Sequence, residues 1–118
     1  DEEKEISLLV DMDKIALQAN VALTVGLIVN EVLVHMYRDA FDYSKFGKIS
    51  LAVKKDESNC VLINISDDGS GLNSILDGTV EDSLGSVIIK TLAQKLDATL
   101  TQRENDEGGT IFTILFYI

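Results

Sequence analysis

The sequence contains no proline and a single cysteine among its 118 residues. A chain without proline, internal repeats or low-complexity stretches offers no linker at which two domains would separate. We therefore expect one domain over residues 1–118, a length near the commonest domain size. The lone cysteine, Cys60, excludes an internal disulfide and fits a reducing compartment, so a cytoplasmic protein is expected.

Basic residues are scarce, because ten Lys and Arg stand against twenty Asp and Glu and give a formal net charge of −10 at pH 7. Nucleic-acid backbones require basic patches, so nucleic acid is not the expected partner. Acidity does not exclude a mononucleotide. Backbone N–H groups, a helix N-terminus, one or two cations and a metal can hold a small phosphate group whatever the net charge.

Long apolar runs are also absent, since no uninterrupted run reaches the roughly 20 residues that span a bilayer. The nearest candidate, residues 21–34, contains Asn30 and Glu31. No signal peptide is visible, because the chain opens with three acidic residues rather than a basic stretch. We therefore expect no direct membrane contact.

Hydrophobic patterning predicts five strands and two helices. The expected strands are residues 6–10, 48–55, 60–66, 98–103 and 110–118, and the expected helices are 21–40, capped by Asn20, and 84–96. In this order the two helices can cover only one face of a sheet made of two hairpins and an edge strand. The pattern predicts an α/β (α+β) two-layer sandwich with a mixed, mainly antiparallel sheet.

The first predicted helix is apolar almost all round, yet Glu31, His35 and Arg38 lie on one stripe. Spacings of four and three residues place these side chains on one helix face. An ionisable group on an apolar helix costs free energy unless it is paired or solvated. The stripe is consistent with the solvated side of an amphipathic helix and also with the wall of a phosphate site. The sequence of this helix alone does not distinguish the two alternatives.

Three glycine-containing segments adjoin the predicted elements. Residues 67–71 (Asp-Asp-Gly-Ser-Gly) follow a strand that should be buried, and their glycines allow close approach to a flat ligand. Residues 83–85 (Ser-Leu-Gly) open a helix whose N–H groups and dipole favour phosphate. Residues 108–110 (Gly-Gly-Thr) lead into the last strand. Taken singly, the three segments are also consistent with a turn, a capped helix start and a hairpin.

Taken in order, these motifs resemble those of the GHKL ATPase superfamily, which includes gyrase, heat-shock chaperones and histidine kinases. The pattern is most similar to the ATP-binding catalytic domain of sensor histidine kinases in two-component systems. Residues 27–41 resemble the N box, 65–72 the first glycine box, 83–96 the second glycine box and 109–116 the terminal strand motif. The resemblance spans residues 6–118 and implies the GHKL (Bergerat) ATP-binding fold.

The resemblance implies an adenine-binding half of the site. Asp67 would accept a hydrogen bond from the adenine amine, and Thr110 on a neighbouring strand would assist through a water. Gly69 and Gly71 would admit the adenine and the ribose. Residues 73–84 would form the ATP lid.

The resemblance implies a phosphate-binding half as well. Leu84 and Gly85, at the start of the second helix, would meet the phosphates, and Arg38 would act as a phosphate cation. Glu31 stands where hydrolytic members of the superfamily carry the general base.

Two positions depart from the family pattern. The family's Mg²⁺ ligand is an asparagine at the position of His35, and Mg²⁺ prefers oxygen ligands to an imidazole. Asp39 adds a negative charge where the family has a neutral or basic residue. We therefore expect a pocket that still forms, but in which binding of ATP with Mg²⁺ and phosphoryl transfer are weakened or lost.

The implied function is delivery of the ATP γ-phosphoryl to a histidine on a separate phosphoacceptor and dimerisation domain, with a response regulator as further partner. His35 is the sole histidine and lies on the pocket helix, so the acceptor must lie outside this chain. The alternative is a degenerate GHKL domain, a phosphotransferase-like or interaction module with weak or no ATP binding. An anti-sigma-factor-type serine kinase shares the fold, but Asn30 and Glu31 look more like the sensor kinases.

Overall fold

The computed structural model describes residues 5–40, 46–69, 84–106 and 108–118. Its elements are β1 (Glu5–Met12), α1 (Ala19–His35), the π-helical turn η1 (Met36–Ala40), β2 (Phe46–Lys55), β3 (Cys60–Asp67), α2 (Leu84–Lys95), β4 (Thr99–Glu104) and β5 (Thr110–Tyr117).

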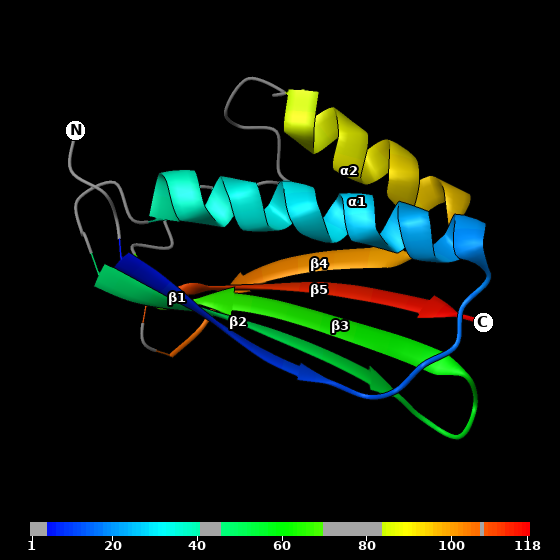
Figure 1. Ribbon diagram of the computed structural model, residues 1–118. Coiled ribbons are helices and arrows are strands. Elements are labelled where there is room, and N and C mark those ends of the chain that lie inside the picture. Colours follow the sequence, from blue (N-terminus) through cyan, green and yellow to red (C-terminus); the bar gives the residue numbers. More distant parts are fainter. Residues whose placement is uncertain (1–4, 41–45, 70–83, 107) are drawn as a thin grey trace.

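The five strands form one sheet in the order β1-β2-β3-β5-β4. The edge strand β1 runs parallel to β2, and the other three pairings are antiparallel. Both helices lie on the same face of the sheet (Figure 1). The predicted two-layer sandwich with a mainly antiparallel sheet is therefore confirmed.

The two central strands β3 and β5 alternate strictly between buried and half-buried positions over most of their length. Such alternation places every second side chain on the face that the helices cover. The register pairs Ile65 with Phe112 and Ile63 with Ile114 on that inner face. The helices complete the core with buried residues at helical spacing: Ile28, Val32 and Met36 from α1 and its π turn, and Ile89 and Ala93 from α2.

The first helix departs from its predicted bounds at both ends. It begins at Ala19, and the preceding Gln18 makes no side-chain cap hydrogen bond, so the predicted cap at Asn20 was wrong. Asn20 lies inside the helix, where its carbonyl accepts a hydrogen bond of 2.9 Å from the Thr24 hydroxyl. At the other end the α-helix stops at His35 and continues as a π turn, whose wider winding alters which side chains share a face.

By length and composition, Ala19–Arg38 could span a membrane. In the structure the inward side of this segment lies on the sheet, where Ile28 and Val32 are completely buried. Its outward side leaves Leu23 and Leu27 exposed. The apolar composition of α1 thus serves the core on one side and forms exposed apolar surface on the other.

Candidate functional site

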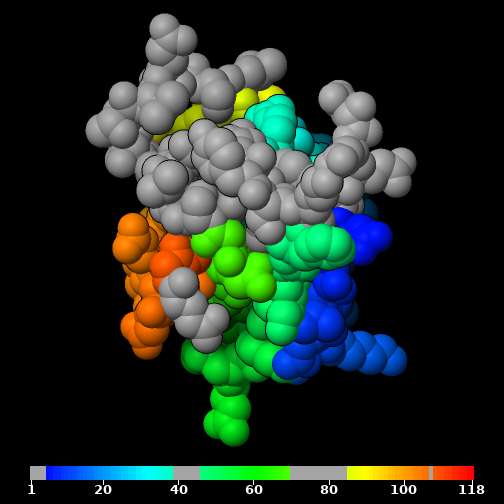
Figure 2. All heavy atoms as spheres, turned by 90° about the vertical axis from the view of Figure 1, so that its left-hand side faces the viewer, coloured from blue at the N-terminus to red at the C-terminus, as the bar shows by residue number. Residues whose placement is uncertain are grey.

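Elements far apart in the sequence meet at one end of the sandwich, on the left of Figure 1. Here β3 ends, β5 begins, α1 passes into its π turn and α2 starts. The antiparallel pairing of Ser66 with Ile111 brings the end of β3 beside the start of β5. Figure 2, which faces this end, shows the light-green end of β3 against the orange-red start of β5.

All three buried polar residues of the described chain lie in this region: Asp67 at the end of β3, Ser86 in the first turn of α2, and Thr110 at the start of β5. Buried polar groups need hydrogen-bond partners, so their clustering marks the place where the interior is built for polar contacts. Asp67 and Thr110 are predicted site residues, whereas Ser86 has no predicted role.

The carboxyl group of Asp67 is the central feature of this region. The residue is 4% exposed. Its Oδ1 accepts a hydrogen bond of 2.9 Å from the Gly69 N–H, and its Oδ2 is buried with no hydrogen-bond partner among the described residues. A buried acceptor without a partner costs free energy and suits a ligand that brings a donor.

Burial is also the main reason that the pKa of Asp67 is raised above its ordinary value. The N–H groups of Gly69 and Thr110 donate to the carboxyl and lower the pKa, while the negative charge of Asp68 raises it further. The carboxylate form is thus costly in the folded protein until a donor meets it.

Asp68, the next residue, faces a different environment. It is exposed, and its Oδ1 accepts a hydrogen bond of 2.8 Å from the Lys48 N–H. Its own N–H donates to the Lys48 carbonyl at 3.2 Å. Asp68 therefore closes the β2–β3 pairing, whereas Asp67 turns inward, as the alternation along a strand requires.

The turn between β4 and β5 is pressed against the end of β3. The side chain of Asn105 donates to the Asp67 carbonyl at 3.0 Å and accepts from the Gly109 N–H at 2.8 Å. A Cβ added to Gly109 would overlap the backbone oxygen of Asp67. Gly108 has φ +91°, a conformation that glycine adopts without strain. Asn105 was missed in the sequence, although an asparagine in a glycine-rich turn is a residue that bonds to backbone groups.

The predicted stripe on the first helix is only partly reproduced. Glu31 and His35 are half-buried and share a face of α1, and the Nε2 atom of His35 is buried. Arg38 is exposed and lies in the π turn, beyond the end of the α-helix, so it does not continue their face by regular α-helical spacing. All three nevertheless stand at the end of α1 where the Asp67 region lies (Figure 1). The side chain of Asp39 is outside what the structure describes.

On the phosphate side, Leu84 and Gly85 are the first two residues of α2, as predicted for a helix start. The N–H groups of a first helical turn have no partner within the helix and favour anions. Gly71 and residues 73–83 of the predicted lid lie outside the described residues, as does the side chain of Leu84.

Within the described ranges, no three His, Cys, Asp or Glu side chains stand close enough to hold a metal ion. Mg²⁺ bound with a nucleotide commonly keeps several waters and takes phosphate oxygens as ligands. A metal held mainly by a phosphate ligand would not need such a cluster of side chains.

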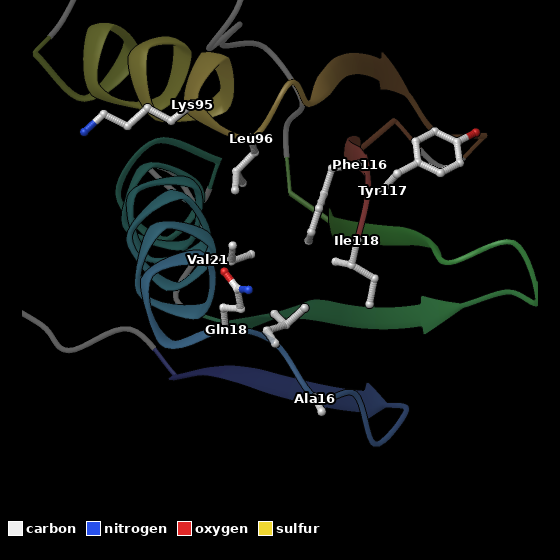
Figure 3. Close-up of a pocket in the computed structure, with 9 residues that line it drawn as sticks. Ala16, Gln18, Val21, Lys95, Leu96, Phe116, Tyr117 and Ile118 are labelled. Carbon is white, nitrogen blue, oxygen red and sulfur yellow. The ribbon is translucent and has the colours of Figure 1, made fainter.

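Two hollows lie away from this region and are lined mainly by aliphatic side chains. One of about 360 Å³ opens at the opposite end of the sandwich; Figure 3 shows Val21, Leu96 and Phe116 converging on it from α1, the end of α2 and β5, while the Lys95 amine and the Tyr117 ring extend away. The other, about 300 Å³, lies between α1 and strands β1 and β2. Neither is lined by Asp67 or by the start of α2.

No family model matches the chain. Blue-light-activated histidine kinase 2 of Erythrobacter litoralis (strain HTCC2594) is 29% identical over 106 residues, which is 90% of this chain and 31% of that protein. The solved histidine kinase domain of the Erythrobacter litoralis EL346 blue-light activated histidine kinase is 30% identical with a TM-score of 0.83, over 94% of this chain and 54% of that one.

A second structure of the EL346 kinase gives a TM-score of 0.87 at 29% identity, over 98% of this chain and 36% of that one. The chain thus spans between about a third and about half of these relatives. Both the sequence match and the structural match cover nearly all of this chain. It therefore has the fold of a histidine kinase catalytic domain, which confirms the family resemblance predicted from its sequence.

Proposed function

We propose that the chain is the ATP-binding domain of a two-component sensor histidine kinase, which binds ATP at the Asp67 end of the sandwich and presents the γ-phosphoryl to a histidine on a separate domain. The observation that carries this proposal is the buried Oδ2 of Asp67, which has no hydrogen-bond partner among the described residues. The similarity to histidine kinases over 90% or more of the chain supports it.

Asp67 would select the base. Its carboxylate accepts hydrogen bonds only, and adenine offers an exocyclic amine where guanine offers a carbonyl oxygen. A guanine at this edge would place two acceptors face to face in a buried setting. The N–H groups of Gly69 and Thr110 hold the carboxyl in place, and the missing side chain at Gly109 leaves the adjoining backbone close to Asp67.

The start of α2 and the end of α1 would hold the phosphates. The first-turn N–H groups at Leu84 and Gly85 and the exposed cation of Arg38 supply positive potential, and bound Mg²⁺ would neutralise the phosphate charge. Glu31, half-buried on α1, is the proposed polar group nearest the reaction. Catalysis in such a site consists mostly of positioning and electrostatic stabilisation.

The phosphoacceptor is proposed to be a histidine outside the chain. His35, the sole histidine, is half-buried on the helix that covers the sheet, and its Nε2 is buried. Such a side chain is poorly placed to receive a phosphoryl group. A response regulator would then take the phosphoryl from the external histidine, and we place this exchange in the cytoplasm.

The purified chain is expected to bind ATP in a calorimetric titration, more tightly with Mg²⁺ than with EDTA, and to bind GTP at least about tenfold more weakly because of the Asp67 acceptor. Absence of ATP binding in both conditions would overturn the proposal. It would favour the degenerate, interaction-module function, for which the imidazole at the expected Mg²⁺ position is the supporting observation.

His35→Asn is expected to strengthen ATP binding in Mg²⁺ by about tenfold, since an amide oxygen suits Mg²⁺ better than an imidazole does. The same variant titrated in EDTA is the control and should bind like the unaltered chain. An equal gain in both conditions would show that the imidazole obstructs the nucleotide rather than the metal. No gain in either condition would contradict the prediction that His35 weakens the binding of Mg²⁺ with ATP.

A further inference from the structure

We propose that Asn105 is a positioning residue for Asp67: its side-chain amide holds the Asp67 backbone so that the carboxyl faces the nucleotide base. The inference deepens the proposed function and rests on it for the identity of the ligand. The hydrogen bonds and contacts that support it are all formed between described residues of this chain.

The Asn105 side-chain amide forms hydrogen bonds at both of its ends. Nδ2 donates to the Asp67 carbonyl at 3.0 Å, and Oδ1 accepts from the Gly109 N–H at 2.8 Å. Both bonds are partly buried. One side chain therefore joins the last residue of β3 to the residue just before β5. A side chain of this length with one donor and one acceptor group is required for both bonds.

The contact between Asn105 and Asp67 lies just beyond the end of the β3–β5 ladder. The β3–β5 register ends with the pair Ser66 and Ile111, so Asp67 stands one position beyond the last pair of that ladder. There the Asp67 carbonyl is bonded by Asn105, a residue 38 positions away. The Asn105 amide thus takes the place of a ladder bond where the ladder stops.

Different groups hold the backbone of Asp67 and its carboxyl group. The Asp67 peptide group is fixed on its carbonyl side by Asn105, and the carboxyl is held by the Gly69 and Thr110 N–H groups. Gly109 packs so tightly against the same carbonyl that a Cβ has no room. Removing the Asn105 side chain removes the hydrogen bond to the Asp67 carbonyl. Oδ2 of Asp67 can then turn away from the nucleotide base while the rest of β3 stays paired.

The chain offers a matched control in Asn64. Its Oδ1 accepts a partly buried hydrogen bond of 2.7 Å from the Thr113 hydroxyl, and this bond also joins β3 to β5. Asn64 lies three positions before Asp67, so alternation along the strand turns it to the sheet face opposite the helices. Truncating either asparagine removes a side-chain hydrogen bond to or from β3, but of the two only Asn105 contacts Asp67.

The test compares binding of ATP with binding of an analogue that lacks the exocyclic amine, purine riboside triphosphate. Asn105→Ala is expected to weaken ATP binding by about tenfold and to leave the analogue unchanged, so that discrimination between the two falls by about tenfold. Asn64→Ala should leave that ratio unaltered even if its unfolding temperature drops. An equal loss for both nucleotides in Asn105→Ala would overturn the proposal, because a structural role alone weakens both.

A second readout needs no nucleotide and separates failure of this inference from failure of the proposed function. Carboxyl NMR titration should show the Asp67 pKa falling toward its ordinary value in Asn105→Ala, because the released carboxyl reaches solvent, and staying raised in Asn64→Ala. A pKa unchanged by Asn105→Ala would overturn the positioning role whether or not ATP binds. If Asn105→Ala does not fold, Asn105→Asp serves in the nucleotide test, since it keeps the acceptor for Gly109 and loses the donor to Asp67.

Discussion

Replacing Asp67 with asparagine is expected to weaken ATP binding by about 100-fold, the equivalent of about 2.7 kcal/mol for a hydrogen bond to a charged group. The buried Oδ2 has no partner among the described residues, so the ligand amine would be its first. An asparagine amide places a second donor against the amine or must rotate away from the N–H groups that hold it. Either arrangement loses the contact that selects adenine.

The same substitution should leave the domain as stable as before, or more stable, at neutral pH. Burial raises the pKa of Asp67 in the folded state above its unfolded value. The unfolded chain therefore ionises first as the pH rises, and stability falls between the unfolded and the folded pKa. Below the unfolded pKa both states are protonated and this cost vanishes. The neutral amide of the Asp67→Asn variant has no such cost, so the stability difference between the two proteins should grow as pH rises from about 4.

Calorimetry with ATP and urea unfolding at several pH values would measure both effects on one pair of proteins. Asp68→Asn is the matched control, because it removes a neighbouring carboxylate that is exposed and bonded to the Lys48 N–H instead. Its ATP affinity should stay within about threefold, the scale of a screened surface charge. If Asp67→Asn binds ATP as well as Asp68→Asn does, the base is not recognised at Asp67.

The sheet and its core could be predicted from sequence because their signals are local. Residues 60–66 and 110–118 place an apolar side chain at every second position, and a strand has no other way to bury such a set on one face. The position of Asp67 one step beyond that pattern also follows directly. Its inward direction continues the alternation of Val61, Ile63 and Ile65.

The features that the sequence did not reveal depend on tertiary contacts. Asn20 is a good cap by type, but the helix starts one residue earlier, at Ala19. Most helix stability in proteins comes from tertiary packing, so a single cap residue does not fix the start of a helix. The α-helix ends at His35 and continues as a π turn over Met36–Ala40, and residue preferences do not encode that winding. The Asn105 side chain donates a hydrogen bond to the carbonyl of Asp67, which is 38 residues away. The sequence around Asn105 does not predict this partner.

Gly109→Ala is expected to destabilise the domain by about 3 kcal/mol, at the upper end of the usual cost of overpacking. The new methyl group would overlap the backbone oxygen of Asp67 and approach the Asn105 amide nitrogen at 2.9 Å. Backbone cannot rotate away as a flexible side chain can, so the end of β3 and the start of β5 must separate. ATP binding should be lost in the same variant, because the Thr110 N–H that holds the Asp67 carboxyl moves with that separation.

Two further glycines turn this prediction into a graded comparison. Gly26 lies in α1 with no atom within 4 Å of an added Cβ, so Gly26→Ala should stabilise the domain by about 0.5–1 kcal/mol through helix propensity. Gly108 also has open space, but its φ of +91° makes Gly108→Ala cost about 1 kcal/mol through backbone strain alone. Urea unfolding of the three variants should therefore rank Gly26→Ala above the unaltered chain, then Gly108→Ala, then Gly109→Ala. A Gly109→Ala protein as stable as Gly108→Ala would contradict the close packing of Gly109 against the Asp67 carbonyl.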